Sequence, residues 1–470
     1  MRKRLLLVGL ALSALLAGLV VPAALSNPGS VGSASGFEDD DGNLAVDSAF
    51  DWNGFNPTTW TGTAPNRTSS TTASGWAFTG LEDAQATTSD SGLAGGTKQD
   101  NECPSVITAK AANKDDLKRV YFANKTVDGN VYLDLAWARI PQNTTAPSAH
   151  VAFEFDQGTT SCGAGSDELV HRSTANGGDM LIVYDFEGGA TDTPHIKLER
   201  WVGTGACEVS SHSPPCWGPA KDLTDLGFAE AKVNTTATVL DTIAPSNENL
   251  GLNEFGEAGI DLTAAGVFPK DVCVGFGKGY AVSRTSGNSA TAQMKDLVGP
   301  GDVNIANCGA IKITKTSSKD DSPLAGAEFD IRKAADNSLV AHVTTGPDGT
   351  ACEGDLPLGD YTVTETAAPS GYQADDTSAH TVTVSAIGTC GSGNEATISF
   401  SDTPLSEIQV KFTSLAGPGV TKASIVCEKA GSAVSPVSEN GSADPAFDDT
   451  DETFTDLAPG TYTCTVVVDP

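Results

Sequence analysis

Apolar residues recur at every second position in several short stretches of the first two thirds of the chain. Strict alternation of this kind is typical of strands with one buried face. The alternating positions are Val131, Leu133, Leu135 and Trp137; Val151, Phe153 and Phe155; Met180, Ile182, Tyr184 and Phe186; and Ile196 with Leu198. Helical spacing is confined to short pieces such as residues 113–122, where Leu117, Val120 and Tyr121 follow two aspartates. The pattern predicts a large, jelly-roll-like β-sandwich over residues 37–308, with short helices at the ends of its sheets.

The pattern changes after residue 308, where tryptophan vanishes and alternating Ile, Val, Phe and Thr are separated by tight-turn sequences. Residues 309–404 therefore read as a second, smaller β domain. Its segment DLPLGDYTVTETAAP at 355–369 recurs as DLAPGTYTCTVVVDP at 456–470, and such a repeat predicts a related third module over residues 405–470. Because only the first copy is followed by further strand sequence, we expect the third module to be reduced or truncated. The predicted fold class is all-β, with β-sandwich domains in tandem.

Residues 1–26 have the pattern of a secretory signal peptide, in which basic residues precede an apolar run and then small residues. An uncleaved membrane anchor stays open as an alternative, because the apolar run approaches the length that spans a bilayer. A Ser/Gly-rich linker, residues 27–36, follows. The expected location is secreted or on the extracellular cell surface. Contact with a membrane is expected only through this signal segment or through an anchor beyond residue 470.

The composition of the chain indicates which binding partners are disfavoured and whether its cysteines are oxidised. The chain carries 60 acidic against 28 basic residues, for a net charge of -32, which disfavours nucleic acid and anionic lipid as partners. Ten cysteines without Cys-x-x-Cys spacing indicate structural disulfides in an oxidising compartment. Grouping cysteines by module predicts the pairs Cys352–Cys390 and Cys427–Cys464. The six histidines lack ligand spacing, and we predict no metal and no cofactor.

Three ionisable residues of the second domain share the inward phase of their strands. Lys315, Glu365 and Asp402 each follow apolar residues two and four positions earlier. These apolar residues are Ile313 and Ile311, Val363 and Tyr361, and Phe400 and Ile398. Unpaired buried charges cost several kcal/mol each, so the three groups must neutralise one another by protonation, by hydrogen bonding or by reaction. An amine facing a protonated carboxylic acid holds the reactants of amide formation, and a third carboxyl can move the protons.

At these residues the sequence resembles the SpaA-like, or collagen-adhesin B-type, prealbumin-fold domains of bacterial surface proteins and pili. The shared segments, in chain order, are IKITKT, LAGAEFDI, LPLGDYTVTETAAPSGY and ISFSDTP. The resemblance implies an intramolecular isopeptide bond from Lys315 to Asp402, assisted by Glu365 of the E-T-x-A-P motif. Many members have Asn where this chain has Asp402, and with Asp the leaving group is water. A buried ion triad without a bond is the alternative.

The same resemblance implies that the two small modules are prealbumin-like sandwiches and that the chain is similar to secreted surface proteins of actinobacteria. The third module departs from the crosslinking pattern. Val466 takes the position of Glu365, and Lys411 alternates out of phase with its apolar neighbours and should face solvent. We expect no isopeptide bond there. Cys427 and Cys464 share the inward phase instead.

The first domain offers weaker candidates. Glu154 and Asp156 lie on one strand face in SAHVAFEFDQ, which loosely resembles a metal-binding strand of legume-type lectins. They could bind a cation or act as acid and base, or they could form an ordinary solvated strand face. Asp39, Asp41 and Asn43 form an oxygen-rich cluster that lacks the trailing Glu of an EF-hand, so a merely acidic leading segment is favoured over a calcium loop.

Trp201 and Trp217 lie in segments that suggest a lectin-like sandwich with exposed aromatic residues, although ordinary core positions are favoured for both. Nucleophile-elbow, zincin, Walker and dinucleotide-binding motifs are missing from the sequence, so no enzyme is predicted beyond the autocatalytic crosslink. The predicted function is that of a secreted or cell-surface, cell-wall-associated structural or adhesin-like bacterial protein with a crosslinked stalk. A carbohydrate-binding lectin is the alternative, and a secreted glycoside hydrolase is less favoured. An extracellular glycan or a host or matrix protein is the expected partner.

Overall fold

The computed structural model describes residues 30–469 apart from 57, 86–89, 95–99, 110, 141–146, 159, 164–168, 190–191, 270–271, 287–291, 412–421 and 435–450. The predicted signal peptide lies outside the described residues. In the part of the chain that is described, no helix is long and apolar enough to cross a membrane. The fold is almost entirely β, as the alternating sequence pattern predicted.

Two large sheets form the first domain. The first has the strand order β1-β2-β3-β6-β7-β16-β13, and the second has β11-β10-β9-β8-β17-β18 with β12 beside β10. The strands of the first sheet are, in that order, Trp60–Thr63, Asn66–Ala73, Trp76–Glu82, Leu117–Val127, Asn130–Arg139, Phe255–Asp261 and Ala229–Val233. Those of the second are Cys216–Trp217, His195–Val202, Met180–Phe186, Ala149–Asp156, Gly275–Arg284 and Met294–Ala306, with β12 at Lys221–Asp222. Two short hairpins, β4 (Asp90–Leu93) with β5 (Val106–Ala109) and β14 (Val239–Asp241) with β15 (Glu248–Leu250), accompany them.

The central strands of the first sheet are buried on both faces. One face packs on the second sheet through a core that includes Leu135 and Phe153. The opposite face is covered by a second core, in which Val31 and Trp52 contribute from α1 (Val31–Ser35) and the 3-10 turn η1 (Trp52–Phe55). The predicted linker 27–36 is therefore wrong for residues 31–35. These residues form a short helix because Ser30 caps it and Val31, which is 5% exposed, has an apolar surface to cover.

The helix expected over residues 113–122 is also wrong beyond its first turn. Only η2 (Asn113–Asp115) is helical, and β6 begins at Leu117. A register irregularity between Leu117 and Arg119 places the consecutive inward residues Leu117 and Val120 three positions apart and so imitates helical spacing. Tyr121 points to the opposite core and not to a helix face. Among the described residues of this domain, the remaining short helical element is η3 (Ala175–Gly177).

Two four-stranded sheets make up the second domain, with strand orders β22-β19-β26-β24 and β21-β20-β23-β25. In that order the strands are Thr350–Pro357, Cys308–Ser317, Ala396–Pro404 and Tyr372–Ala374, then Leu339–Thr344, Glu328–Lys333, Gly359–Ala367 and His380–Val384. The first strand, β19, runs parallel to the last, β26, and is its direct neighbour. A core that includes Ile313, Phe329 and Val363 fills the space between the sheets.

The third module has a two-stranded sheet, β27-β30, and a three-stranded sheet, β29-β28-β31. Their strands are Ser406–Lys411, Asp451–Leu457, Ser432–Val434, Lys422–Lys429 and Thr463–Asp469. The side chain of Lys411 is exposed, in agreement with its predicted phase. Tandem β-sandwiches, the predicted fold class, thus describe the molecule.

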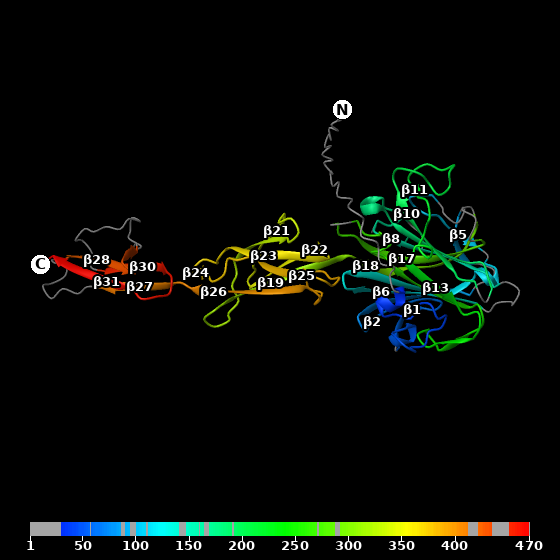
Figure 1. The fold of residues 1–470 in the computed structure, drawn as a ribbon, viewed down its shortest axis with the longest axis horizontal. Coiled ribbons are helices and arrows are strands. Elements are labelled where there is room, and N and C mark those ends of the chain that lie inside the picture. The colour runs from blue at the N-terminus through cyan, green and yellow to red at the C-terminus, as the bar shows by residue number, and fades with distance from the viewer. Residues whose placement is uncertain are drawn as a thin grey trace, which may run out of the picture.

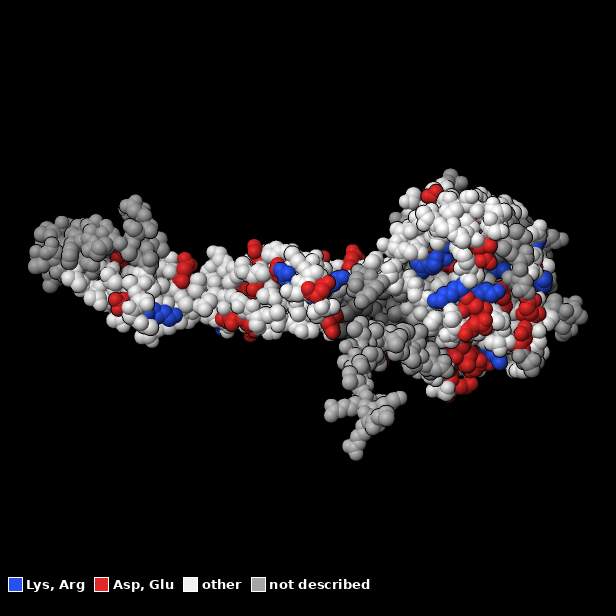
Figure 2. Space-filling model, turned by 45° about the horizontal axis from the view of Figure 1, so that its top comes forward, with Lys and Arg blue, Asp and Glu red and all other residues white. Residues whose placement is uncertain are grey.

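The modules are arranged in a line, with the large domain at one end and the third module at the other (Figure 1). Acidic and basic side chains are interspersed on the visible face of the large domain (Figure 2). The junction between the first two domains is short, because a single residue, Asn307, separates β18 from β19. The Cys273–Cys308 disulfide and the packing of Leu358 and Ile387 on the core of the first domain fix this junction.

Candidate crosslink site

The site lies between the two sheets of the second domain. Lys315 is on β19 and Asp402 on the neighbouring parallel strand β26, where the residue opposite Lys315 is Phe400. Asp402 is thus displaced by two residues along its strand, on the same inward face, and a lysine side chain is long enough to cover this offset. Glu365 comes from β23 in the facing sheet. The strand phases predicted from the sequence therefore converge on one point.

The three side chains are in direct contact and excluded from water. Lys315 Nζ donates a hydrogen bond to Glu365 Oε2 at 2.7 Å and a second hydrogen bond to Asp402 Oδ1. Each of the three side chains is 0% exposed. Asp402 Oδ1 also accepts a hydrogen bond from the backbone N–H of Asp375 at 3.2 Å. The Phe400 ring closes one side, with its centroid 5.9 Å from Lys315 Nζ.

Burial determines the protonation states of these three side chains. Desolvation raises the pKa of Glu365 to about 7, against the lowering effect of its hydrogen bond from Lys315 and with a further rise from Asp402. Two acids thus share one amine. Glu365 Oε1 and Asp402 Oδ2 have no hydrogen-bond partner among the described residues. A carboxyl with a pKa near neutrality can both accept and return a proton, which is the property required of a general acid–base.

The predicted disulfides of the small modules are formed in the structure. Cys352 bonds to Cys390, and Cys427 bonds to Cys464. The three bonds of the first domain, whose pairing the sequence left open, are Cys103–Cys162, Cys207–Cys216 and Cys273–Cys308. In the third module Val466 is 38% exposed, and Lys411 is on the outer face. No crosslinking triad of the second-domain kind is formed around these two residues.

The carboxylates Glu154 and Asp156 are not on a solvated strand face, and that interpretation is wrong. They are 3% and 1% exposed, because the outer face of β8 is covered by a small core that includes Trp201 and Trp217. Arg172 binds Glu154 through both of its carboxylate oxygens, at 2.5 and 2.7 Å. Buried in this way, the pair cannot meet a polysaccharide as acid and base.

The suggestion of exposed aromatic residues in the first domain is wrong as well, and the core positions favoured for them are correct. Trp201 and Trp217 are each 1% exposed, with Arg172 stacked over both rings. Asp39 is 1% exposed and belongs to the domain interior, so the acidic leading segment is not simply solvated. Asp41 is exposed and accepts hydrogen bonds from Asn43.

Sequence reasoning missed the Arg172 pair and the other buried acids of the first domain. A signal was present in the strand at 180–186, where apolar residues occupy both phases. A strand of this kind is covered on both faces. Acids on its neighbouring strands are then buried in either phase.

Comparison with known proteins identifies the second domain. Residues 309–395 match the family model SpaA, described as a prealbumin-like fold domain. The match includes Lys315 and Glu365 and ends before Asp402. These residues are therefore a SpaA-type prealbumin-like domain, as their motifs predicted. The match covers well under half of the chain and describes the fold of this domain alone.

Similar solved structures include a streptococcal ancillary pilin, at 16% identity over 47% of this chain and 72% of that one, with a TM-score of 0.23. The TIE protein of Bacillus anthracis is 17% identical over 75% of this chain and 52% of that one, with a TM-score of 0.25. The shaft pilin SpaA of Lactobacillus rhamnosus GG is 12% identical over 35% and 88%, with a TM-score of 0.24. TM-scores of this size carry no argument about the whole chain. No curated protein matches it.

Proposed function

We propose that the chain is a secreted, cell-surface structural or adhesin-like protein, in which an isopeptide bond between Lys315 and Asp402 reinforces a stalk that presents the first domain. The contact of Lys315 with both acids in a water-free site is the observation that carries this proposal. The SpaA-type fold of the domain and the linear arrangement of the modules (Figure 1) support it.

The reaction balances without a co-reactant. The Lys315 ammonium gives one proton to Glu365, and the free amine attacks the Asp402 carboxyl carbon. Glu365 returns the proton to the departing carboxyl oxygen, a second amine proton follows it, and one water leaves as the C–N bond forms. The proton relay requires Glu365 to touch the amine, and Oε2 is 2.7 Å from it.

The position of the bond suits a load-bearing role. Tension from the first domain enters the second at the start of β19, and tension from the third module enters at the end of β26. Because these strands are parallel neighbours, a pull on the two ends shears them past each other. A covalent bond from Lys315 to Asp402 would carry that load and leave the intervening chain folded.

Single-molecule pulling on the protein from its two ends tests this role. In the unaltered protein the segment from Lys315 to Asp402, a sequence separation of 87, should not extend at any force below bond rupture. The Lys315→Arg variant should add an extension step. The disulfide keeps 38 of these residues closed, so the step should involve about 49 residues, roughly 160–180 Å of chain.

An equal step in the unaltered protein would contradict the stalk role. Lys312→Arg provides the matched control, because this residue is on the same strand with its side chain on the opposite phase. It should behave like the unaltered protein.

Neither a lectin nor a glycoside hydrolase is proposed, because the tryptophans and the acid pair on which those alternatives depended are buried. The partner of the displayed domain is expected outside the cell, as a glycan or a protein.

A further inference from the structure

Four buried aspartates meet where the two sheets of the first domain approach each other. Asp83 directly follows β3, Asp90 begins β4, Asp116 precedes β6, and Asp296 is on β18. Their exposed fractions are 8%, 7%, 0% and 0%. One carboxylate oxygen from each of Asp83, Asp90 and Asp296 lies within 4.8 Å of the other two. So many acids at one interior point require a compensating positive charge or bound protons.

The side chain of Asp116 provides a second, independent observation. It is fully buried, yet neither of its carboxylate oxygens has a hydrogen-bond partner among the described residues. Its charge acts on the cluster, because it contributes to the raised pKa of both Asp83 and Asp296. One oxygen of Asp83 and one of Asp296 are likewise without a partner in the described structure. Three chain segments thus each contribute an acid with an unused acceptor to this part of the domain.

Two basic side chains of this region are paired with glutamates. Lys118 Nζ donates to Glu248 at 2.5 Å, and Arg67 forms a two-point ion pair with Glu82. Within the described residues, no Lys or Arg forms an ion pair with Asp83, Asp116 or Asp296. Left to themselves, these acids would have to bind protons, and burial accordingly raises the pKa of Asp83 to about 8 and that of Asp116 to about 7.

We propose that Asp83, Asp90 and Asp296 bind one calcium ion, with Asp116 as an outer acid whose charge adds to the attraction. Calcium takes six to eight oxygen ligands at about 2.3–2.6 Å, so oxygens on one ion lie within about 5 Å of each other. The three carboxylates meet that condition. Magnesium is a poorer fit, because it demands near-ideal octahedral geometry and keeps several of its waters.

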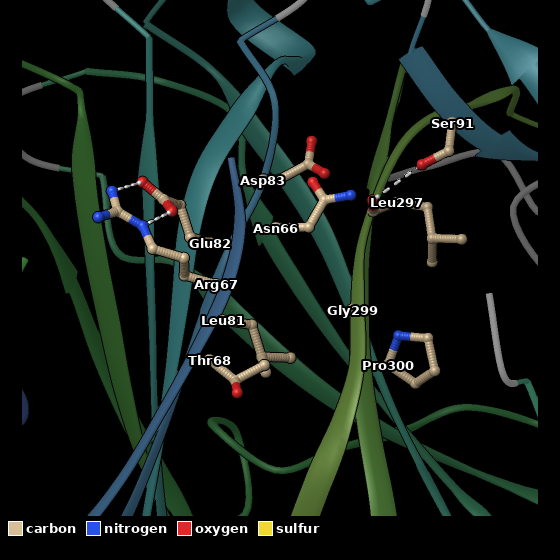
Figure 3. A pocket seen from close by; sticks show the side chains of 10 residues that line it. All are labelled: Asn66, Arg67, Thr68, Leu81, Glu82, Asp83, Ser91, Leu297, Gly299 and Pro300. Carbon is tan, nitrogen blue, oxygen red and sulfur yellow. Dashed lines mark hydrogen bonds and ion pairs between the residues drawn. The ribbon is translucent and has the colours of Figure 1, made fainter. Parts of the chain in front are cut away.

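A surface pocket gives an ion a route to the cluster. It is lined by Asp83 itself, by Ser91, which follows Asp90, and by Leu297, which follows Asp296. Figure 3 shows Asp83 and Asn66 among the residues that line this pocket. Hydrated cations can therefore approach from the Asp83 side and lose their waters to the carboxylates.

The ion would join parts of the fold that are far apart in sequence. β3 and β6 belong to the first sheet and β18 to the second. β18 also leads directly into β19, the first strand of the stalk. Calcium would thus fasten the last strand of the displayed domain near its first residues, at the end of β18 that lies away from the stalk.

The test is calcium binding by the full-length protein after exhaustive treatment with a chelator, measured by isothermal titration calorimetry and thermal unfolding. We expect one site that is lost on Asp296→Asn, with a Kd on the order of 10⁻⁴–10⁻³ M, the range of extracellular calcium modules. Calcium at about a hundredfold excess over Kd should raise the melting temperature of the first domain by roughly 5–10 °C.

Asp296→Asn should also raise the melting temperature in chelator, because it removes a buried acid, and this outcome shows that the variant folds. Asp302→Asn is the matched control, on the same strand with an 88% exposed side chain, and it should bind calcium like the unaltered protein. If the unaltered protein binds no calcium, or if it and Asp296→Asn bind calcium equally, the proposal is overturned. In either case the cluster is held together by protons alone.

Discussion

Glu365→Ala is expected to leave Lys315 and Asp402 unjoined and to lower the melting temperature of the second domain by roughly 15–30 °C. The bond closes 87 residues, of which the Cys352–Cys390 disulfide already closes 38. The loop-entropy model assigns the remaining closure about 4 kcal/mol. Without the crosslink, Lys315 and Asp402 also stay as a buried ion pair, whose net contribution is small. Differential scanning calorimetry of the whole protein resolves the change.

Two further variants separate the crosslink from simple loss of a carboxylate. Glu328→Ala removes a half-exposed glutamate from β20 in the same domain and should cost less than about 1 kcal/mol. Asp402→Asn keeps a reactive carbonyl and should still form the bond, with loss of ammonia in place of water. If the Glu365→Ala variant has the same melting temperature as the unaltered protein, no bond depends on this residue.

Arg172→Ala is expected to destabilise the first domain by about 3–5 kcal/mol, the usual cost of removing one partner from a buried ion pair. The guanidinium binds both oxygens of Glu154 and lies over the rings of Trp201 and Trp217 at 5.1 and 4.9 Å. Removing it leaves the Glu154 charge buried next to Asp156. Denaturant unfolding followed by tryptophan fluorescence measures the loss.

Adding Glu154→Gln to Arg172→Ala should recover part of the lost stability, because the orphaned charge is removed. Arg67→Ala provides the control in the same domain. Its ion pair with Glu82 is partly exposed, at 29% and 14%, and its loss should cost no more than about 1 kcal/mol. Equal losses for Arg67→Ala and Arg172→Ala would refute the account of Glu154 as a structural acid.

The crosslink site could be located from the sequence because its strands have one buried face. On such strands a period of two fixes which side chains point inward, and Lys315, Glu365 and Asp402 all share the phase of buried neighbours. Adjacency of the first and last strands was not readable from this pattern. It came from the family resemblance, and the parallel pairing of β19 with β26 agrees with it.

For the first domain, only the fold class could be predicted from the sequence. Its central strands are buried on both faces, so alternation no longer separates interior from exterior. Glu154 was assigned to solvent for this reason, although Trp201 and Trp217 cover that face of its strand. The bulge at Leu117 caused the wrong prediction of a helix over residues 113–122, because one extra residue in the strand changed the spacing of its inward residues to a helical one. The bulge has no local sequence signature, and the covering layer is indicated only by the apolar residues in both phases of the neighbouring strand at 180–186.

Intact-mass spectrometry of the secreted protein tests the central claim most directly. With its ten cysteines in five disulfides, the protein should be lighter than its sequence by the corresponding hydrogens and by one additional water. A proteolytic fragment should contain the segments around Lys315 and Asp402 joined after reduction, and Lys315→Arg should restore the missing water. A protein that retains the full mass, disulfide hydrogens apart, would show that Lys315, Glu365 and Asp402 form only a buried ion cluster.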